Sequence, residues 1–294
     1  TRWVSDWSSD VCSSDLRGVA EALDLLEYTN LPTGTYWSDR RAANGRIEPY
    51  GIRMWCLGNE MDGPWQIGNR TATEYGRLAG QTARAMRMAV PDLELVVCGS
   101  SGTGMPTFGE WEAEVLTQTY PDVDYISLHA YYEEHDGDLG SFLASTLDMD
   151  WYIRSVVATA DHVGAKLGSR KRIQLSFDEW NVWYMSRWMQ RSKNQEWAHA
   201  PRQLEDVYSV ADAVVVGNML ICLLRNSDRV AVACQAQLVN AIAPIMTEPG
   251  GPAWRQTIFH PFAQASALAR GEVLRVEPRA PTYDTARHGP APLV

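Results

Sequence analysis

A short apolar run, residues 52–57, ends abruptly in the polar sequence Gly58-Asn59-Glu60. Such a run is typical of a buried strand, and the glycine that follows it marks the strand's carboxyl end. In parallel α/β folds, that end of the strands is where ligands bind and chemistry takes place. Glu60 is therefore predicted to be a carboxylate at the mouth of a sheet or barrel, with the amide of Asn59 beside it. Taken alone, the stretch is equally consistent with a glutamate that only caps a loop or the next helix.

The same pattern recurs further along the chain. The β-prone run at residues 173–177 leads to Glu179, which aromatic residues follow, and another strand leads to His129 and Tyr131. Carboxylate, amide and aromatic side chains together suit a sugar, because hydroxyl groups need hydrogen bonds and the C–H faces of the ring need a flat apolar surface. Two strand-end glutamates in one barrel mouth are also what glycoside hydrolysis requires, one as the acid/base and the other as nucleophile or base.

Strands and helices are predicted to alternate, which favours a parallel α/β fold. The predicted strands are residues 52–57, 93–98, 123–128, 173–177 and 230–233. The predicted helices are residues 17–28, 73–89, 110–117, 143–167, 204–224 and 260–270. The spacing of Thr71 and Glu74 predicts a capping box at the start of one of these helices. The strand count corresponds to about five βα units of a (β/α)8 TIM barrel, which needs eight.

Three segments lie outside this alternation. Residues 184–205 are predicted to form a long polar loop that overhangs the site. No helix or strand is predicted for residues 36–50, and residues 272–276 are predicted to begin a β-like segment. Residues 1–16 contain the near-repeat SSDVCSSDL and have no helical or strand periodicity, and they lack the apolar core of a secretory signal. We interpret them as a non-native or disordered leader.

Charge and cysteine content argue against several classes of function. The formal net charge of −10 disfavours nucleic acid and anionic membranes as partners. The five cysteines are odd in number and widely spaced, so we expect buried free thiols in a reducing compartment and no zinc site. No run of 18 apolar residues is present, and no membrane-spanning helix is predicted.

Three longer strings carry a resemblance to a known family: WCLGNEMDGPWQIG at residues 55–68, FDEWNVWY at 177–184 and AQLVNAIAPI at 236–245. In this order they resemble glycoside hydrolase family 51, in the clan of retaining (β/α)8-barrel glycosidases. The resemblance implies an α-L-arabinofuranosidase that releases terminal non-reducing α-L-arabinofuranosyl residues from arabinoxylan, arabinan and related oligosaccharides by double displacement. It also implies a cytoplasmic bacterial enzyme without a cofactor, and a homo-hexamer for the full-length family member.

The resemblance assigns roles to individual residues. Glu60 is expected to be the general acid/base, and Glu179 the nucleophile that forms a covalent glycosyl-enzyme. We expect their carboxyl groups to lie about 5 to 5.5 Å apart, as in retaining enzymes. The resemblance also implies substrate-binding residues, which are Asn59 on the sugar's 2-hydroxyl, His129, Tyr131 as the residue that orients the nucleophile, Trp183 as a wall of the pocket, and Gln237.

Several neighbouring residues receive other interpretations. Asn240 is an alternative to Gln237 as a sugar contact, and Asp178 is given a structural role in the barrel wall. Trp55 and Trp65 are expected to provide dry surroundings for Glu60. The acidic loop with His135, Asp136 and Asp138 is interpreted as a solvated loop rather than a metal site, because hydrolysis of this type needs no metal.

The resemblance divides the chain into the leader at residues 1–16, a partial TIM-barrel catalytic domain at 17–271, and the start of a truncated C-terminal β-sandwich domain at 272–294. The family's first barrel strands are absent, which leaves open sheet edges. We therefore expect this chain by itself to fold poorly and to be inactive. The alternatives are a β-xylosidase or endoglucanase of the same family, or an inactive fragment that binds sugar or misfolds.

Overall fold

A computed structural model describes residues 2–3, 18–193, 196, 198–199 and 201–293. The chain divides into two units. The N-terminal unit comprises residues 6–128 and 155–176, and the C-terminal unit comprises residues 1–5, 129–154 and 177–294. Two strands, β4 (Tyr125–Tyr132) and β5 (Gln174–Val182), begin in the first unit and end in the second.

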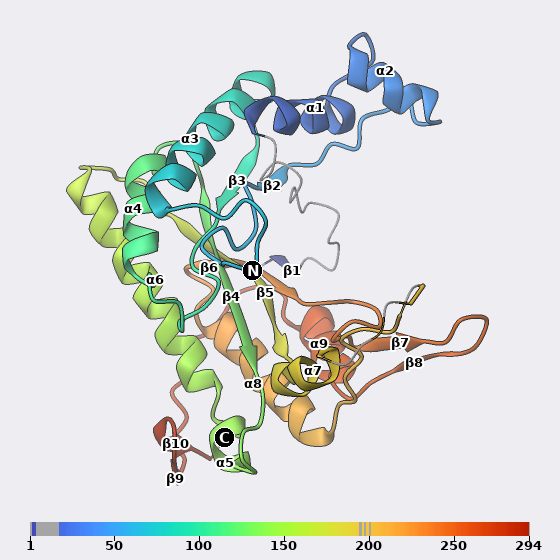
Figure 1. Ribbon diagram of the computed structural model, residues 1–294. Coiled ribbons are helices and arrows are strands. Elements are labelled where there is room, and N and C mark those ends of the chain that lie inside the picture. The colour runs from blue at the N-terminus through green and yellow to red at the C-terminus, as the bar shows by residue number, and fades with distance from the viewer. Residues whose placement is uncertain (1, 4–17, 194–195, 197, 200, 294) are drawn as a thin grey trace. The chain divides into compact units, whose positions relative to one another are not determined.

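The described part of the N-terminal unit begins with two helices, after which strands and helices alternate in sequence. Its helices are α1 (Val19–Asn30), α2 (Tyr36–Ala43), α3 (Ala72–Ala89), α4 (Glu110–Thr119) and the second part of α6 (Thr146–Lys166). Its strands follow the order β2 (Met54–Cys56), β3 (Glu94–Val97), β4 and β5. The pairs β2–β3 and β3–β4 are parallel. Helix α3 packs against α1 and α4 (Figure 1).

In the C-terminal unit, the strand order is β4, β5, β6 (Val230–Gln235) and β1 (Arg2–Trp3), with β1 parallel to β6. Its helices are the first part of α6 with α5 (Leu139–Leu143), α7 (Met185–Ser192), α8 (Val210–Arg225) and α9 (Phe259–Leu268). Two antiparallel hairpins complete it, β7 (Ile245–Thr247) with β8 (Ala253–Arg255) and β9 (Thr282–Thr285) with β10 (Gly289–Pro292).

From β2 to β6, each strand is a neighbour of the strand that follows it in the sequence. A doubly wound sheet reverses its strand order at a switch point, whereas a barrel adds each new strand on the same side. The order is therefore that of a barrel wall. All five strands predicted from the sequence are present, and the predicted α/β fold of five βα units is confirmed.

Tyr75 on α3 joins the carboxyl ends of β2 and β3. Its buried hydroxyl donates a hydrogen bond to the carbonyl of Leu57 at 2.7 Å and accepts one from the N–H of Cys98 at 2.8 Å. The Tyr75 ring stacks on Trp111 of α4, with 5.5 Å between centroids, and the Trp111 indole donates to the carbonyl of Cys98 at 3.0 Å. Because polar loops follow both strands at this point, the contacts of Tyr75 set where those loops begin.

The start of α3 matches its sequence signal. The hydroxyl of Thr71 accepts a hydrogen bond from the N–H of Glu74 at 3.3 Å, and the Glu74 carboxylate accepts one from the N–H of Thr71 at 3.1 Å. The predicted capping box is thus confirmed. Helix α8 has the same kind of start at Ser209 and Asp212, so it begins later than the predicted residue 204.

Helix α2 was not predicted, and its burial explains why. Its sequence, YWSDRRAA, is mostly polar. Arg41 is nevertheless fully buried, and its guanidinium donates to the carbonyls of Tyr28, Leu31 and Ile47 at 2.7 to 2.8 Å. Its Nε also donates to the carbonyl of Arg46 at 3.2 Å. A buried arginine that satisfies four carbonyls looks like a solvent-exposed residue in a hydrophobicity pattern, so the helix has no apolar face for the sequence to reveal.

Part of the predicted 184–205 loop is also helical, as α7. Aromatic contacts hold this helix, since the Trp188 ring lies 6.1 Å from that of Trp183 and the Arg187 guanidinium stacks 3.8 Å above the Tyr184 ring. Residues 194, 195, 197 and 200 of the predicted loop lie outside the described residues. The β-like segment predicted at residues 272–276 is wrong, because those residues are exposed and pair with no strand among the described residues, and the hairpin lies at β9–β10.

Of the predicted leader, only residues 2–3 fall within the described ranges, as β1; residues 1 and 4–16, including Cys12, lie outside them. The other four cysteines are free thiols, as expected, although only Cys98 and Cys222 are buried. None of the helices in the described ranges is both long and apolar enough to cross a membrane.

Replacing Tyr75 with phenylalanine is expected to lower the free energy of unfolding by about 1 to 3 kcal/mol, because the hydroxyl that bonds Leu57 and Cys98 is lost from a buried site. Urea denaturation measures the change. Tyr36→Phe is the matched control, since the Tyr36 side chain is 74% exposed. Equal effects of the two substitutions would contradict the role given to the Tyr75 hydroxyl.

Candidate active site

Glu60 lies in the loop after β2, where its backbone adopts a left-handed conformation with φ of 49°. The N–H of Gly63 donates to the carbonyl of Glu60 at 2.8 Å and closes the turn. The indole N–H of Trp65 donates to the Glu60 carboxylate at 2.5 Å. A side chain at Gly63 would lie 2.5 Å from the Trp65 ring, so only glycine lets the ring fold back over this turn.

The two tryptophans near Glu60 differ in role. Trp65 is 57% exposed and contacts Glu60 through its N–H, so the expectation that it dries the surroundings of the carboxylate is wrong. Trp55 is buried in β2, and its indole N–H donates to the carbonyl of Ile52 at 3.0 Å. Asn59, the predicted partner of the sugar's 2-hydroxyl, is half-buried in the same loop as Glu60.

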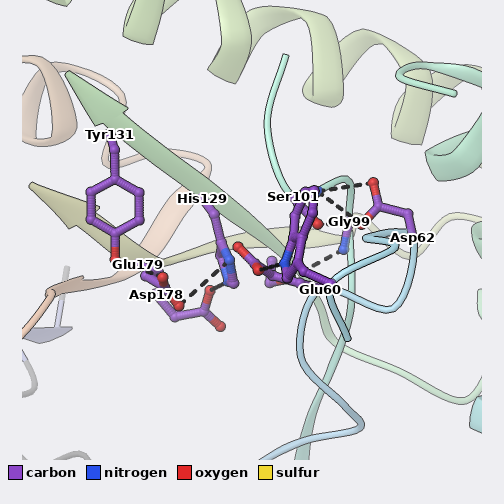
Figure 2. Close-up of polar contacts among 10 residues, drawn as sticks. Glu60, Asp62, Gly99, Ser101, His129, Tyr131, Asp178 and Glu179 are labelled. Carbon is purple, nitrogen blue, oxygen red and sulfur yellow. Dashed lines mark hydrogen bonds and ion pairs between the residues drawn. The ribbon is translucent and has the colours of Figure 1, made fainter. Parts of the chain in front are cut away.

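Asp62 fastens the loop of Glu60 to the loop that follows β3. Each oxygen of its carboxylate accepts a hydrogen bond from the N–H of Ser101 at 3.1 Å, and the Ser101 hydroxyl donates a further one (Figure 2). Burial raises the pKa of the Asp62 carboxyl above its ordinary value of 3.8, and the bonds from Ser101 lower it in part. Sequence analysis assigned no role to Asp62 or Ser101, because only the fold brings the two loops together.

In the second half of β5, the carboxylate of Glu179 is held by residues of β4. The hydroxyl of Tyr131 donates to Glu179 Oε1 at 2.6 Å (Figure 2). His129 is buried beside it, with Nδ1 3.6 Å from Glu179 Oε2 and Nε2 3.2 Å from Asp178 Oδ1. Asp178 therefore belongs to this cluster. Sequence analysis had instead given it a structural role in the barrel wall. The strand pattern places neighbouring residues on opposite faces, and it could not show that one imidazole reaches both carboxylates.

Trp183 forms the next part of this site. Its ring lies edge-on to that of Tyr131, with 5.0 Å between centroids. The indole N–H of Trp183 is buried and has no hydrogen-bond partner among the described residues. Tyr131 and Trp183 both line a cavity of about 280 Å³, to which Glu133, His135 and Arg287 also contribute. The cavity thus combines aromatic faces with hydrogen-bonding groups.

The segment after β6 carries both candidate amides. Gln237 is exposed, and the peptide bond that joins it to Ala236 is cis. The amide of Asn240 is engaged by Thr247 of β7, since its oxygen accepts from the N–H of Thr247 at 2.8 Å and its nitrogen donates to the Thr247 hydroxyl at 3.0 Å. Gln237 therefore has the amide that is more available to a ligand.

The C-terminal unit thus contains His129, Tyr131, Glu179, Trp183 and Gln237, and it gathers the first four of them into one cluster. Asn59 and Glu60 lie in the N-terminal unit.

Two family models match the chain in succession. The α-L-arabinofuranosidase 1 domain matches residues 7–154, and the α-L-arabinofuranosidase C-terminal domain matches residues 178–291. The first match alone covers half of the chain. The chain belongs to the family 51 α-L-arabinofuranosidases. The resemblance that the three sequence strings carry is confirmed.

The similarity to individual proteins of known activity is high. An intracellular exo-α-(1→5)-L-arabinofuranosidase of Streptomyces lividans is 66% identical over 278 residues, which are 95% of this chain and 42% of the relative. An exo-α-(1→6)-L-arabinofuranosidase of Bifidobacterium longum is 54% identical over 288 residues, again 95% of this chain and 55% of the relative.

The fold agrees with that of solved family 51 structures. A family 51 α-L-arabinofuranosidase from Bifidobacterium longum superposes with a TM-score of 0.90 at 47% identity, over 94% of this chain and 56% of that one. The chain spans about half the length of the relatives it matches. Its βα units correspond to part of the family 51 TIM barrel.

The pKa of Asp62 predicts a specific pH dependence of stability. Because this pKa is higher in the folded protein than in the unfolded chain, the contribution of Asp62 to stability is full below pH 3.8 and is lost as the pH rises through the raised value. In Asp62→Asn this contribution is absent. The free energy of unfolding of the variant, minus that of the wild type, is therefore expected to increase as the pH rises through this window. Urea denaturation at a series of pH values measures it, and a difference that stays flat or falls would refute the assignment.

Proposed function

We propose that this chain carries the catalytic residues of a retaining exo-acting α-L-arabinofuranosidase. The main support is the hydrogen bond of 2.6 Å from Tyr131 to Glu179 Oε1. A charge-assisted bond of this length holds a carboxylate in one orientation, as a nucleophile requires. His129 and Trp183, which pack around the same carboxylate and the same tyrosine, extend the site.

In the first step, a carboxylate oxygen of Glu179 attacks the anomeric carbon of the arabinofuranosyl group, and the bond from that carbon to the leaving oxygen breaks. Glu60, as a carboxylic acid, gives its proton to the leaving oxygen, which departs as an alcohol. The product is an ester between the sugar and Glu179. This mechanism requires the two carboxyl groups to lie about 5 to 5.5 Å apart.

In the second step, water attacks the anomeric carbon. Glu60, now a carboxylate, takes a proton from this water. The bond between the sugar and Glu179 breaks, and its electron pair returns to the carboxylate. Two inversions at the anomeric carbon retain its configuration. The hydrogen bond from Trp65 to Glu60 supports this assignment, since it gives the acid/base a defined position through both steps.

The substrate-binding residues act through their positions around this centre. Asn59 binds the sugar's 2-hydroxyl, a contact that strengthens in the transition state. Trp183 forms a wall of the pocket, where its ring packs edge-on to that of Tyr131. His129 lines the same site, and the exposed amide of Gln237 supplies a further sugar contact.

The proposed substrates are arabinoxylan, arabinan and their oligosaccharides, cleaved at terminal non-reducing α-L-arabinofuranosyl groups. The relatives named above act on (1→5) and (1→6) linkages. This supports an exo-acting enzyme that removes terminal arabinofuranosyl groups from arabinan chains or from arabinose side chains. Several relatives are named as intracellular enzymes, and we propose a cytoplasmic location and oligosaccharide substrates accordingly. Assembly as a homo-hexamer stays a prediction.

The proposed function is tested by measuring the hydrolysis of aryl glycosides by the full-length gene product. Hydrolysis of aryl α-L-arabinofuranoside with retention of configuration is expected. Faster hydrolysis of aryl β-xyloside, or of an internal glucan linkage, would instead favour a β-xylosidase or endoglucanase.

Substitution of the two glutamates is expected to separate their roles. Glu179→Ala should abolish turnover of every arabinofuranoside. Glu60→Ala should lose activity on oligosaccharides but keep it on an aryl glycoside with a good leaving group, which departs without a proton. Glu110→Ala, which removes an exposed carboxylate of α4, is the control. The acid/base assignment is wrong if Glu60→Ala loses the same factor in kcat/KM on both kinds of substrate.

Tyr131→Phe tests the orientation of the nucleophile. Loss of the hydroxyl that holds Glu179 is expected to lower kcat about 10- to 100-fold, because the carboxylate is no longer fixed. Tyr132→Phe is a matched control, since its hydroxyl bonds Asp148 at 3.0 Å instead of Glu179. Steady-state kinetics on aryl arabinofuranoside measure both variants. A loss of equal size in the two would show that the effect does not come from Glu179.

A further inference from the structure

Asn181 is fully buried, and both ends of its amide are satisfied by the end of β6 and the segment after it. Its nitrogen donates to the carbonyl of Ala236 at 2.5 Å and to that of Ile242 at 2.6 Å. Its oxygen accepts from the side chain of Gln235 at 3.1 Å and from the N–H of Val182 at 2.9 Å. The amide has thus used both of its donors and both of its acceptor positions.

The two carbonyls lie at the two ends of the segment 236–242. Between them the chain has little regular structure, and Asn240 and Ile242 adopt left-handed conformations with φ of 63° and 40°. A β-branched residue such as isoleucine rarely takes up a positive φ, and it does so only where surrounding contacts fix it. Asn181 supplies one of those contacts, and the carbonyl of Leu204, which accepts from the N–H of Ile242 at 2.6 Å, supplies another.

Asn181 also has a fixed relation to the candidate nucleophile. It follows Glu179 by two residues on β5, and residues two apart on a strand face the same side. Gln237, the exposed amide of the 236–242 segment, is next to Ala236, whose carbonyl Asn181 binds. One buried side chain therefore joins the strand that carries Glu179 to the segment that carries Gln237.

We propose that Asn181 is a positioning residue that sets where Gln237 lies relative to Glu179. A buried amide with every hydrogen bond made has one favoured geometry, because any displacement leaves a buried polar group unpaired. The assignment of Glu179 and Gln237 to the sugar site rests on the proposed function. The statement that Asn181 holds the 236–242 segment does not depend on it.

The first test measures the segment itself, in the full-length gene product. In Asn181→Ala, hydrogen–deuterium exchange of the amides of residues 237–242 is expected to become at least about tenfold faster, with β4 unchanged. Asn181→Asp keeps the shape of the side chain and its acceptor oxygen but cannot donate to both carbonyls, so it should show the same change. Asn226→Ala is the control, because Asn226 also bonds through its side-chain nitrogen, to Asp150 and the carbonyl of Cys222, at the end of α8.

The second test measures kinetics on aryl α-L-arabinofuranoside. Asn181→Ala is expected to lower kcat/KM about 100-fold, since a displacement of about 1 Å in a binding group costs this much. If Asn181 acts through Gln237, the substitution should have little further effect in a Gln237→Ala background. A residue that only stabilised the fold would reduce activity by the same factor in both backgrounds.

The outcomes separate the two proposals. Unchanged exchange of residues 237–242 in both Asn181 variants would overturn the positioning role. So would a double variant in which Asn181→Ala and Gln237→Ala lower kcat/KM by the product of their separate factors. A wild-type enzyme without arabinofuranosidase activity would overturn the proposed function, while the exchange experiment would still decide whether Asn181 holds the segment.

Discussion

The residues proposed to carry the chemistry of this protein lie in the carboxyl-terminal parts of its strands, as His129, Tyr131 and Glu179 do, or in the loops that follow, as Glu60 does. Their positions depend on a few buried or half-buried polar side chains that bind loop backbone. Tyr75 joins the ends of β2 and β3, Asp62 binds the loop after β3, and Asn181 binds the segment after β6. A buried polar group that loses its partner costs on the order of 1 to 3 kcal/mol, so each of these contacts favours one loop conformation strongly.

Asp62 and Asn181 occupy equivalent places relative to the two candidate catalytic glutamates. Each comes two residues after its glutamate, and each bonds a loop that follows the next strand along the chain. Each glutamate also accepts a hydrogen bond from an aromatic side chain. Trp65 donates to Glu60, and Tyr131 donates to Glu179. Holding reactive groups on a rigid frame lowers the barrier of a reaction, because the entropy of alignment has already been lost in folding.

Elements with a clear hydrophobic period were predictable, and elements stabilised by polar or aromatic contacts were not. The five strands and the capping box of α3 follow from local patterns. Helix α2 was missed because its buried residues are the polar Ser38 and Arg41, and Arg41 binds backbone carbonyls in the segments on either side of the helix. The contact of Asp178 with His129 was missed because it depends on how β4 and β5 pair, and the residue alternation of one strand does not contain that information.

By itself, the sequence determined the fold class, the family and the identity of the candidate catalytic and sugar-binding residues. The fold class follows from apolar runs that end in polar residues such as Asn59-Glu60 and Glu179, and the family and the candidate residues follow from the resemblance of three strings to family 51. Only the tertiary structure decided which side chains hold them. Neither the bond between Asn240 and Thr247 nor the bonds of Asp62 and Asn181 are visible in the chain, because their partners are separated by up to 61 residues and come together only when the chain folds.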